Sequence, residues 1–176
     1  MNTYESPALS EIVSYMNHHN DNFTAEMLIR TLGAMVNGSG TFDDGIDTVH
    51  TMMKKVNSTL FDMMDGSGWT KYTQISAWQV ASLLAAQTEK PAFQVFYDSL
   101  ANAGEDGSLK TELAGISSSQ LTGILENRAD MPGLSGYVRT KDGEILAYSL
   151  MLNGYSQTES IQLVKNFANK LVELAQ

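Results

Sequence analysis

The sequence has 176 residues, with 11 basic and 20 acidic side chains, a formal net charge of -9 and no cysteine. That length suits one domain with a substantial core, and a composition that is 43% hydrophobic and 18% charged is typical of a globular protein. The acidic balance argues against binding to nucleic acid or to an anionic membrane surface, and the lack of cysteine excludes disulfides and thiolate metal sites.

The first part of the chain has the apolar spacing of helices. A helix is predicted with Ser6 as its N-cap, because Pro7 suits the first helical position. A second helix is predicted after Asn22, with Gly33 near its end. The residues expected on the buried face of this second helix recur at helical spacing: Phe23, Met27, Leu28 and Leu32.

Two capping boxes predict further helix starts. In this motif the hydroxyl of the first residue hydrogen-bonds to the backbone N–H three residues later, and the side chain of that later residue hydrogen-bonds to the backbone N–H of the first. Thr41 and Asp44 are predicted to begin a third helix, and Ser76 and Gln79 a fourth. The fourth helix should stop before Pro91, which can itself begin a short helix.

The last third of the chain is rich in aromatic and branched residues. Residues 134–140 and 144–153 are predicted to form a β-hairpin through Lys141-Asp142-Gly143. Both alternating sets of side chains in the second strand are largely apolar, which predicts a central strand with helical layers on both faces. A capping box at Ser156 and Glu159 predicts a C-terminal helix that packs on this sheet.

This order of elements predicts an α+β fold. We expect a single domain over residues 1–176, with a helical part over 1–115 and a sheet with its C-terminal packing helix over 116–176. No run reaches the roughly 20 apolar residues of a membrane-spanning helix. The first residues also lack the basic and apolar stretches of a signal peptide.

No pattern in the sequence predicts a metal or cofactor site. His18 and His19 are adjacent, so on a helix they point about 100° apart and make a poor metal-binding pair. Asp43, Asp44 and Asp47 fall in the first turn of a predicted helix, where the dipole favours negative charge. They lack the spacing of a calcium loop, so we expect no metal.

Several blocks of sequence occur together in one order, at residues 6–13, 20–33, 65–68, 103–109 and 134–138, followed by the C-terminal helix. In that order they resemble the D-alanyl-D-alanine carboxypeptidase/endopeptidase family, the class C low-molecular-mass penicillin-binding proteins. The resemblance implies a β-lactamase/transpeptidase-like fold. It also implies a cofactor-free serine hydrolase of peptidoglycan peptides, located in the periplasm or cell envelope.

The family's chemistry depends on three motifs, S-x-x-K, S-D-N and K-T-G. The first serine attacks the peptide carbonyl while the lysine assists its deprotonation. The resemblance implies that the S-D-N asparagine holds the substrate amide and that the K-T-G strand binds the substrate backbone and carboxylate. This sequence contains no S-x-x-K. Residues 51–54 have its spacing with a threonine, but they lie in a helix that matches no family motif.

The other two motifs are degenerate. The S-D-N position reads Asn20, Asp21 and Asn22, which loses the hydroxyl although Asn22 could still hold an amide. The K-T-G position is predicted at Leu121, Thr122 and Gly123, with Thr122 and Gly123 as candidate substrate-binding residues. Counting back from Leu134, the start of the block at 134–138, without a gap gives residues 124–126, Ile-Leu-Glu, instead. Residues 110–112, Lys-Thr-Glu, follow a different block and are not expected to be this motif.

These departures predict a truncated, catalytically incompetent relative, because losing a nucleophile or its base costs several orders of magnitude in rate. The alternative is one half of a carboxypeptidase that is active only with a complementary chain supplying the nucleophile. Expected partners are therefore a peptidoglycan peptide or such a chain. The hairpin at 134–153 should also leave a sheet edge unpaired and an apolar face uncovered, which predicts a homo-oligomer or swapped dimer.

Overall fold

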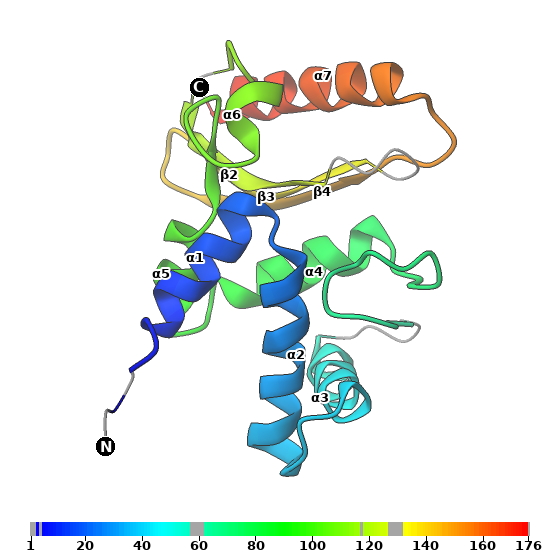
Figure 1. Cartoon of the computed structure of the whole chain (residues 1–176). Coiled ribbons are helices and arrows are strands. Elements are labelled where there is room, and N and C mark those ends of the chain that lie inside the picture. Colours follow the sequence, from blue (N-terminus) through cyan, green and yellow to red (C-terminus); the bar gives the residue numbers. More distant parts are fainter. Residues whose placement is uncertain (1–2, 4, 57–61, 117, 127–131, 176) are drawn as a thin grey trace.

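The structure is a computed structural model, and it describes residues 3, 5–56, 62–116, 118–126 and 132–175. A four-stranded antiparallel sheet lies between a long C-terminal helix and a group of N-terminal helices (Figure 1). The helices are α1 (Leu9–His19), α2 (Asn22–Asn37), α3 (Phe42–Lys55), α4 (Ala77–Gln87), α5 (Phe93–Asp98), α6 (Leu109–Glu112) and α7 (Gln157–Ala175). The strands are β1 (Ala101–Ala103), β2 (Ser118–Glu126), β3 (Gly133–Arg139) and β4 (Ile145–Met151).

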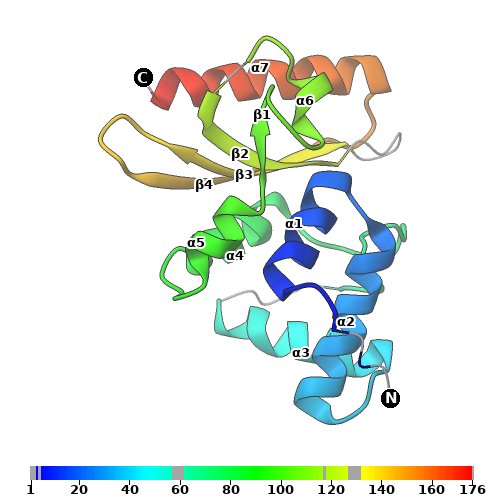
Figure 2. The same cartoon turned by 60° about the vertical axis from the view of Figure 1, so that its left-hand side comes forward.

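The strands follow one another in the sheet in chain order, β1-β2-β3-β4. Helix α7 packs on β2 and β3 from one side, and α4 packs on β3 and β4 from the other (Figure 2). The predicted α+β fold with a hairpin at β3–β4 and a C-terminal packing helix is confirmed. No helix in the described ranges is both long enough and apolar enough to cross a bilayer.

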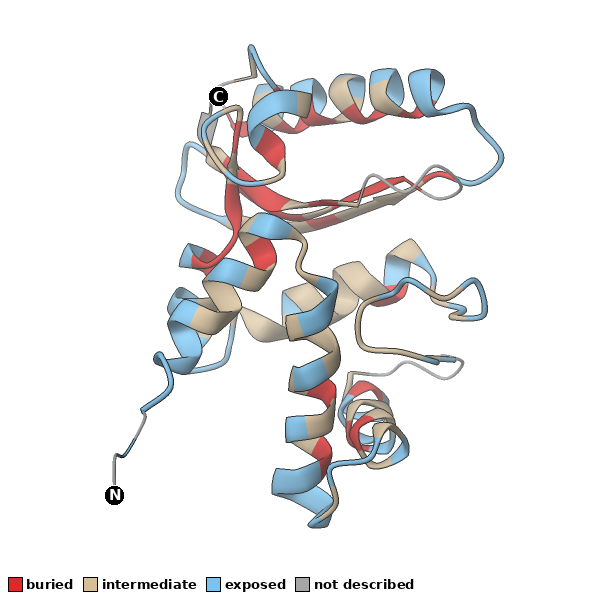
Figure 3. Ribbon diagram, in the orientation of Figure 1, coloured by how far each residue is buried: buried red, intermediate tan, exposed pale blue. Residues whose placement is uncertain are grey.

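Each face of the sheet has its own hydrophobic core. The larger core lies under α7 and joins Leu121, Leu134 and Val138 of the sheet to Val164 and Ala168 of the helix. The smaller core surrounds Tyr137 on the opposite face. Buried residues accordingly follow the strands and the inner side of α7 (Figure 3). Helices therefore cover both faces of the sheet, as predicted, but β4 is the last of the described strands rather than a central one.

The predicted helix starts are confirmed at three capping motifs. Ser76 and Gln79 form a reciprocal capping box at the start of α4. The Thr41 hydroxyl accepts a hydrogen bond from the Asp44 backbone N–H at 3.2 Å. Ser156 and Glu159 likewise bond each other's backbone ahead of α7. These predictions succeed because a cap is decided by residues three positions apart.

Other expectations for the helical part are wrong. Helix α1 begins at Leu9 rather than at Pro7, and its N-cap is Ala8 rather than Ser6. Phe23 and Met27, predicted to face inward, are 72% and 44% exposed. Strand β1 was not predicted, and it falls inside the range 1–115 that was expected to be helical. Strand β2 lies in the range expected for the sheet, where only the resemblance indicated a strand.

Helices α2 and α3 touch through their backbones. A Cβ atom on Gly45 would lie 2.2 Å from the carbonyl oxygen of Ile29, and one on Gly33 would lie 2.8 Å from the backbone N of Gly45. Gly33 is thus a crossing point in the interior of α2, which continues to Asn37, rather than a residue near the helix end. Only glycine permits so close an approach.

Candidate functional site

The turn between α1 and α2 consists of the residues at the S-D-N position. Asn20 ends α1 in the left-handed conformation, with φ of 49°. Asp21 is the N-cap of α2, where its carboxylate accepts hydrogen bonds from the backbone N–H of Thr24 at 3.0 Å and from the Thr24 hydroxyl. Asn22 is the first residue of the helix and is exposed. The turn is therefore held in place by its own caps.

This turn lies against the last residues of β2. The side-chain amide of Asn20 donates to the carbonyl oxygen of Leu125 at 2.9 Å, which ties the helices to the sheet. A pocket of about 110 Å³ opens beside this contact. Its described lining residues are Met16, Asn17, Asn20, Asp21, Asn22, Ala25, Ser67, Ile124 and Glu126.

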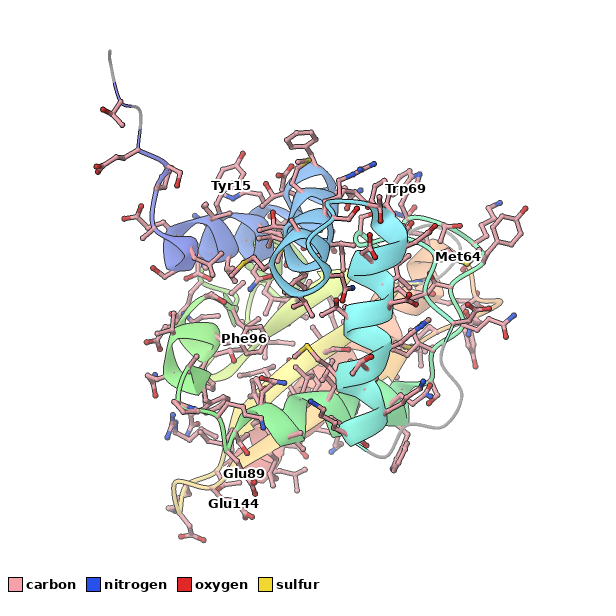
Figure 4. The ribbon with its side chains drawn as sticks, turned by 90° about the horizontal axis from the view of Figure 1, so that it is seen from below. Tyr15, Met64, Trp69, Glu89, Phe96 and Glu144 are labelled. Carbon is pink, nitrogen blue, oxygen red and sulfur yellow. The ribbon has the colours of Figure 1, made fainter. Side chains whose placement is uncertain are left out.

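The pocket has three walls: the α1–α2 turn, the end of β2 and the turn at 65–68. The Glu26 carboxylate, on α2, accepts hydrogen bonds from the backbone N–H groups of Gly66 and Ser67 at 3.1 and 3.0 Å. A Cβ on Gly66 would lie 2.8 Å from the Ala25 carbonyl oxygen, so the turn rests directly on α2. Trp69 follows this turn and is 67% exposed on the outer side of the molecule (Figure 4). The sequence predicted the turn but gave no sign of its contact with α2.

The residues predicted at the K-T-G position lie inside the sheet. Leu121 is fully buried in the core under α7, and Thr122 is 2% exposed. Gly123 is paired with Gly136 of β3. A Cβ atom on Gly123 would lie 2.7 Å from the hydroxyl of Tyr148. None of these three residues lines the pocket. Thr122 and Gly123, two of the three candidate substrate-binding residues, are therefore separated from the third, Asn22.

The ungapped alternative at 124–126 lies next to the turn. Ile124 and Glu126 line the pocket together with Asn20, Asp21 and Asn22. They share one face of β2 because side chains alternate along a strand. The intervening Leu125 points into the core under α7, while its carbonyl accepts from Asn20. The structure thus brings the S-D-N position together with 124–126.

The pocket offers amides and carboxylates. Asn17, Asn20 and Asn22 contribute amide groups, and Asp21 and Glu126 contribute carboxylates. Ser67 has a hydroxyl, which accepts a hydrogen bond from the Trp69 backbone N–H at 3.4 Å. No lysine, arginine or histidine occurs among the described lining residues. The lining named above therefore provides no amine or imidazole to take a proton from this hydroxyl.

The other motif-like segments lie elsewhere. Residues 51–54 are in α3, which packs on α2 away from the sheet (Figure 1). Lys110 is exposed on the short helix α6. Within the described ranges there is no group of three or more His, Asp or Glu side chains positioned to hold a metal ion.

Comparison with known proteins identifies the class to which this fold and pocket belong. A family model described as the D-Ala-D-Ala carboxypeptidase 3 (S13) family matches residues 1–175. The chain belongs to this family, as its sequence blocks predicted. It is also 30% identical over 183 residues to a D-alanyl-D-alanine carboxypeptidase from Actinomadura sp. (strain R39), an alignment that covers 98% of this chain and 33% of the relative.

Two solved structures have the same fold at low sequence identity. Penicillin binding protein 4 from Haemophilus influenzae matches with a TM-score of 0.79 and 20% identity, over 92% of this chain and 39% of its own. A predatory endopeptidase from Bdellovibrio bacteriovorus, solved with an immunity protein, matches with a TM-score of 0.71 and 20% identity, over 95% of this chain and 43% of its own. The chain thus spans less than half of each of these relatives.

Proposed function

We propose that this chain is a non-acylating relative of the D-Ala-D-Ala carboxypeptidases that binds a peptide through the pocket between α1, α2 and β2. The observation that carries the proposal is the make-up of the pocket. It brings the S-D-N position to the end of β2, yet its described lining holds no lysine. Without S-x-x-K in the sequence, the chain has neither the nucleophile nor the base of the family's chemistry.

In this proposal residues 124–126 take the place of the K-T-G motif, because Ile124 and Glu126 line the pocket and residues 121–123 do not. A glutamate and an aspartate then stand where a relative would need positive charge to attract a terminal carboxylate. We expect Asn22 to hold a peptide amide. The preferred ligand is a wall-type peptide that presents an amide or amine to the pocket, in an extracytoplasmic location.

The acylation half of the proposal is tested with a fluorescent penicillin followed by intact-mass measurement of the isolated chain. We expect no covalent adduct, even after long incubation at high concentration. An adduct of one penicillin per chain would overturn the non-acylating assignment. The relative from Actinomadura serves as the labelled control.

The binding half is tested by NMR titration with two peptides that differ only in their ends, a D-Ala-D-Ala carboxylate and its C-terminal amide. We expect the amide to bind more tightly, and Asn22→Ala to weaken binding about tenfold if one hydrogen bond is lost. The matched control is Asn153→Ala, an exposed asparagine between β4 and α7.

The charge argument is tested separately with Glu126→Gln. This change should reduce the difference in affinity between the amide peptide and the carboxylate peptide, because it removes one of the two carboxylate side chains in the pocket. Glu144→Gln is the control, since Glu144 is exposed at the far hairpin (Figure 4). Equal affinities for both peptides in the wild-type chain would contradict the charge argument.

The second candidate function is half of a split carboxypeptidase. It is favoured by the share of the curated relative that the chain covers, 33%. The missing lysine on β2 argues against it, because a second chain could supply a nucleophile more easily than that strand residue. Mixing this chain with the S-x-x-K-bearing segment of the Actinomadura relative separates the two candidates. Penicillin labelling that appears only in the mixture would support the split enzyme and overturn the first proposal.

A further inference from the structure

Asn17 is a buried polar residue in the wall of the pocket between α1, α2 and β2. It lies near the C-terminal end of α1, is 3% exposed, and lines this pocket of about 110 Å³. Its side-chain Nδ2 donates to the Ser99 hydroxyl oxygen at 2.8 Å. In the described part of the chain the Asn17 side chain makes no other hydrogen bond. The carbonyl oxygen of this amide, Oδ1, is therefore left without a protein donor.

Ser99 fixes the orientation of the Asn17 amide. The Ser99 hydroxyl donates its single proton to the Phe96 carbonyl oxygen at 2.6 Å, so toward Asn17 it can only accept. The atom of Asn17 that faces Ser99 must then be the nitrogen, because two acceptors in contact would repel each other. Oδ1 consequently lies on the other side of the amide, where it is the acceptor left for a molecule in the pocket.

Asn20 repeats this arrangement one helical turn later. Its Nδ2 donates to the Leu125 carbonyl oxygen at 2.9 Å, and a backbone carbonyl can only accept. The Asn20 Oδ1 is therefore also an acceptor without a donor among the residues that the structure describes. Asp21 adds a carboxylate, whose Oδ2 accepts from Thr24. The two asparagines thus spend their donors on the protein and leave oxygens for a ligand.

The rest of the lining suits a short alkyl chain that ends in a cation. Met16, Ala25 and Ile124 provide apolar walls beside the acceptors. The volume of about 110 Å³ is well above the roughly 15 Å³ that one water molecule needs, so a larger group can enter. Helix α1 ends at the pocket, and the partial negative charge of a helix C-terminus favours a cation. The opposite charge at the start of α2 is already met by the Asp21 cap.

We infer that this pocket binds a primary ammonium group at the end of an alkyl chain, with the Oδ1 atoms of Asn17 and Asn20 and the Asp21 carboxylate as its acceptors. A primary ammonium carries three N–H donors and no acceptor, so it matches such a set of oxygens. An amide brings an acceptor of its own, which these oxygens would repel. The inference rests on the proposed function for its ligand: a lysine-type side chain of the bound peptide enters the pocket, while Asn22 holds a peptide amide.

The site is tested first on the wild-type chain, by NMR titration with n-butylammonium, n-butyltrimethylammonium and n-butanol. These probes share one alkyl stem, and only the first combines a positive charge with N–H donors. We expect n-butylammonium to shift the side-chain amide signals of Asn17 and Asn20 and to bind at least about tenfold more tightly than the other two. Equal binding of n-butyltrimethylammonium would overturn the inference, because charge alone would then explain the binding. Unshifted Asn17 and Asn20 signals with n-butylammonium would also overturn it.

Two variants separate the Asn17 oxygen from its packing. Asn17→Leu and Ser99→Ala both lose the 2.8 Å hydrogen bond between these side chains, but only Asn17→Leu loses Oδ1. We expect Asn17→Leu to weaken n-butylammonium binding about tenfold. Ser99→Ala should weaken it about twofold at most, because a freed amide that flips still presents its oxygen about half of the time. Equal losses in the two variants would overturn the role of Oδ1.

Asn20→Gly provides a second variant, which keeps the test decisive if circular dichroism shows that Asn17→Leu is unfolded. It removes the other amide oxygen, and glycine retains the left-handed conformation of this position. We expect it to weaken n-butylammonium binding about tenfold as well. An unchanged affinity in Asn20→Gly would overturn the inference.

A last titration separates this inference from the proposed function. The D-Ala-D-Ala amide peptide is prepared with either lysine or norleucine as the preceding residue, because norleucine keeps most of the alkyl stem and lacks the ammonium. We expect the lysyl peptide to bind at least about tenfold more tightly. Equal binding of the two peptides would overturn the ammonium site and leave the proposed peptide binding in place. Binding of n-butylammonium without binding of either peptide would support the site and overturn the proposed function.

Discussion

The sheet with α7 and the pair α2–α3 are packed in different ways. Under α7 the chain buries a continuous set of side chains, with Leu121, Leu134 and Val138 fully enclosed. Between α2 and α3 the backbones approach closely at Gly33 and Gly45. Many residues of these two helices are exposed (Figure 3), and several of them are large and apolar. These exposed side chains are Phe23, Met27, Met35, Val36 and Met52. The first region thus depends on a continuous buried core, whereas the second combines a close backbone approach with a few buried side chains such as Ile29 and Met53.

The largest effect is expected from truncating the core of the sheet. Leu134→Ala should lower the free energy of unfolding by about 3 to 5 kcal/mol, because it removes a fully buried side chain and leaves a cavity. Met35→Ala on α2 should change it by less than about 0.5 kcal/mol, since that side chain is 79% exposed. Urea unfolding of both variants measures the contrast. Similar losses in the two would contradict it.

Alkaline pH should destabilise the sheet region specifically. Burial raises the pKa of Tyr137 and of Tyr148, and the nearby Tyr97 adds to the shift of the Tyr148 pKa. Both stay protonated in the folded chain when the unfolded chain ionises near pH 10, so stability is complete below pH 10 and falls above it. The fall is about 1.4 kcal/mol per pH unit for each tyrosine.

This alkaline loss is measured by urea unfolding between pH 9 and pH 11, with absorbance at 295 nm to follow tyrosine ionisation. Tyr148→Phe should halve the slope of stability against pH. Tyr72→Phe is the control, because Tyr72 is 73% exposed and should leave the slope unchanged. A stability that does not change over this range would show that the two buried hydroxyls ionise in the folded chain.

The glycine crossing should respond in the opposite way to most helical glycines. Alanine usually stabilises an exposed helix by about 1 kcal/mol relative to glycine. Gly45→Ala should instead destabilise by about 1 to 3 kcal/mol, because its Cβ would lie 2.2 Å from the Ile29 carbonyl oxygen. Gly40→Ala, where the nearest atom is 3.8 Å away, should be nearly neutral. Thermal unfolding of the two variants provides the comparison.

The smallest effect is expected where the two regions meet. Asn20→Gly should cost about 1 kcal/mol, because the hydrogen bond to the Leu125 carbonyl is lost while the left-handed conformation is kept. Asn20→Ala should cost about 1 kcal/mol more, since alanine is strained at a φ of 49°. Denaturant unfolding distinguishes the two contributions. Equal losses would mean that the backbone conformation adds nothing.

Local signals predicted part of this structure. The caps at Ser76 and Ser156 and the β3–β4 hairpin depend on residues that are close in sequence, so they could be identified there. β1 has only three residues, and its pairing with β2 is interrupted by an irregularity in register, so no alternating pattern marks it. Phe23 and Met27 have helical apolar spacing, but spacing alone does not say whether another element covers that face.

The candidate site was predicted through resemblance and only in part. Asn20, Asp21 and Asn22 were found in this way, and the structure places them in the pocket. Whether residues 121–123 or residues 124–126 lie beside the S-D-N position depends on how β2 passes the α1–α2 turn. That arrangement involves the contact between Asn20 and Leu125, which are 105 positions apart. The contact of Glu26 with the turn at 65–68 is similarly distant in sequence. No local pattern encodes either contact.

The Glu26 contact also determines which parts of the pocket are joined to each other. Because one carboxylate holds Gly66 and Ser67 to α2, the turn at 65–68 is tied to the helix that begins at Asn22 with Asp21 as its N-cap. Two of the three walls, the α1–α2 turn and the turn at 65–68, are therefore joined through α2. The third wall is the end of β2. The hydrogen bond from the Asn20 side chain to the Leu125 carbonyl joins the α1–α2 turn to β2. A single substitution at Glu26 would therefore release the turn at 65–68 from α2 and leave the contact between α2 and β2 through Asn20 in place.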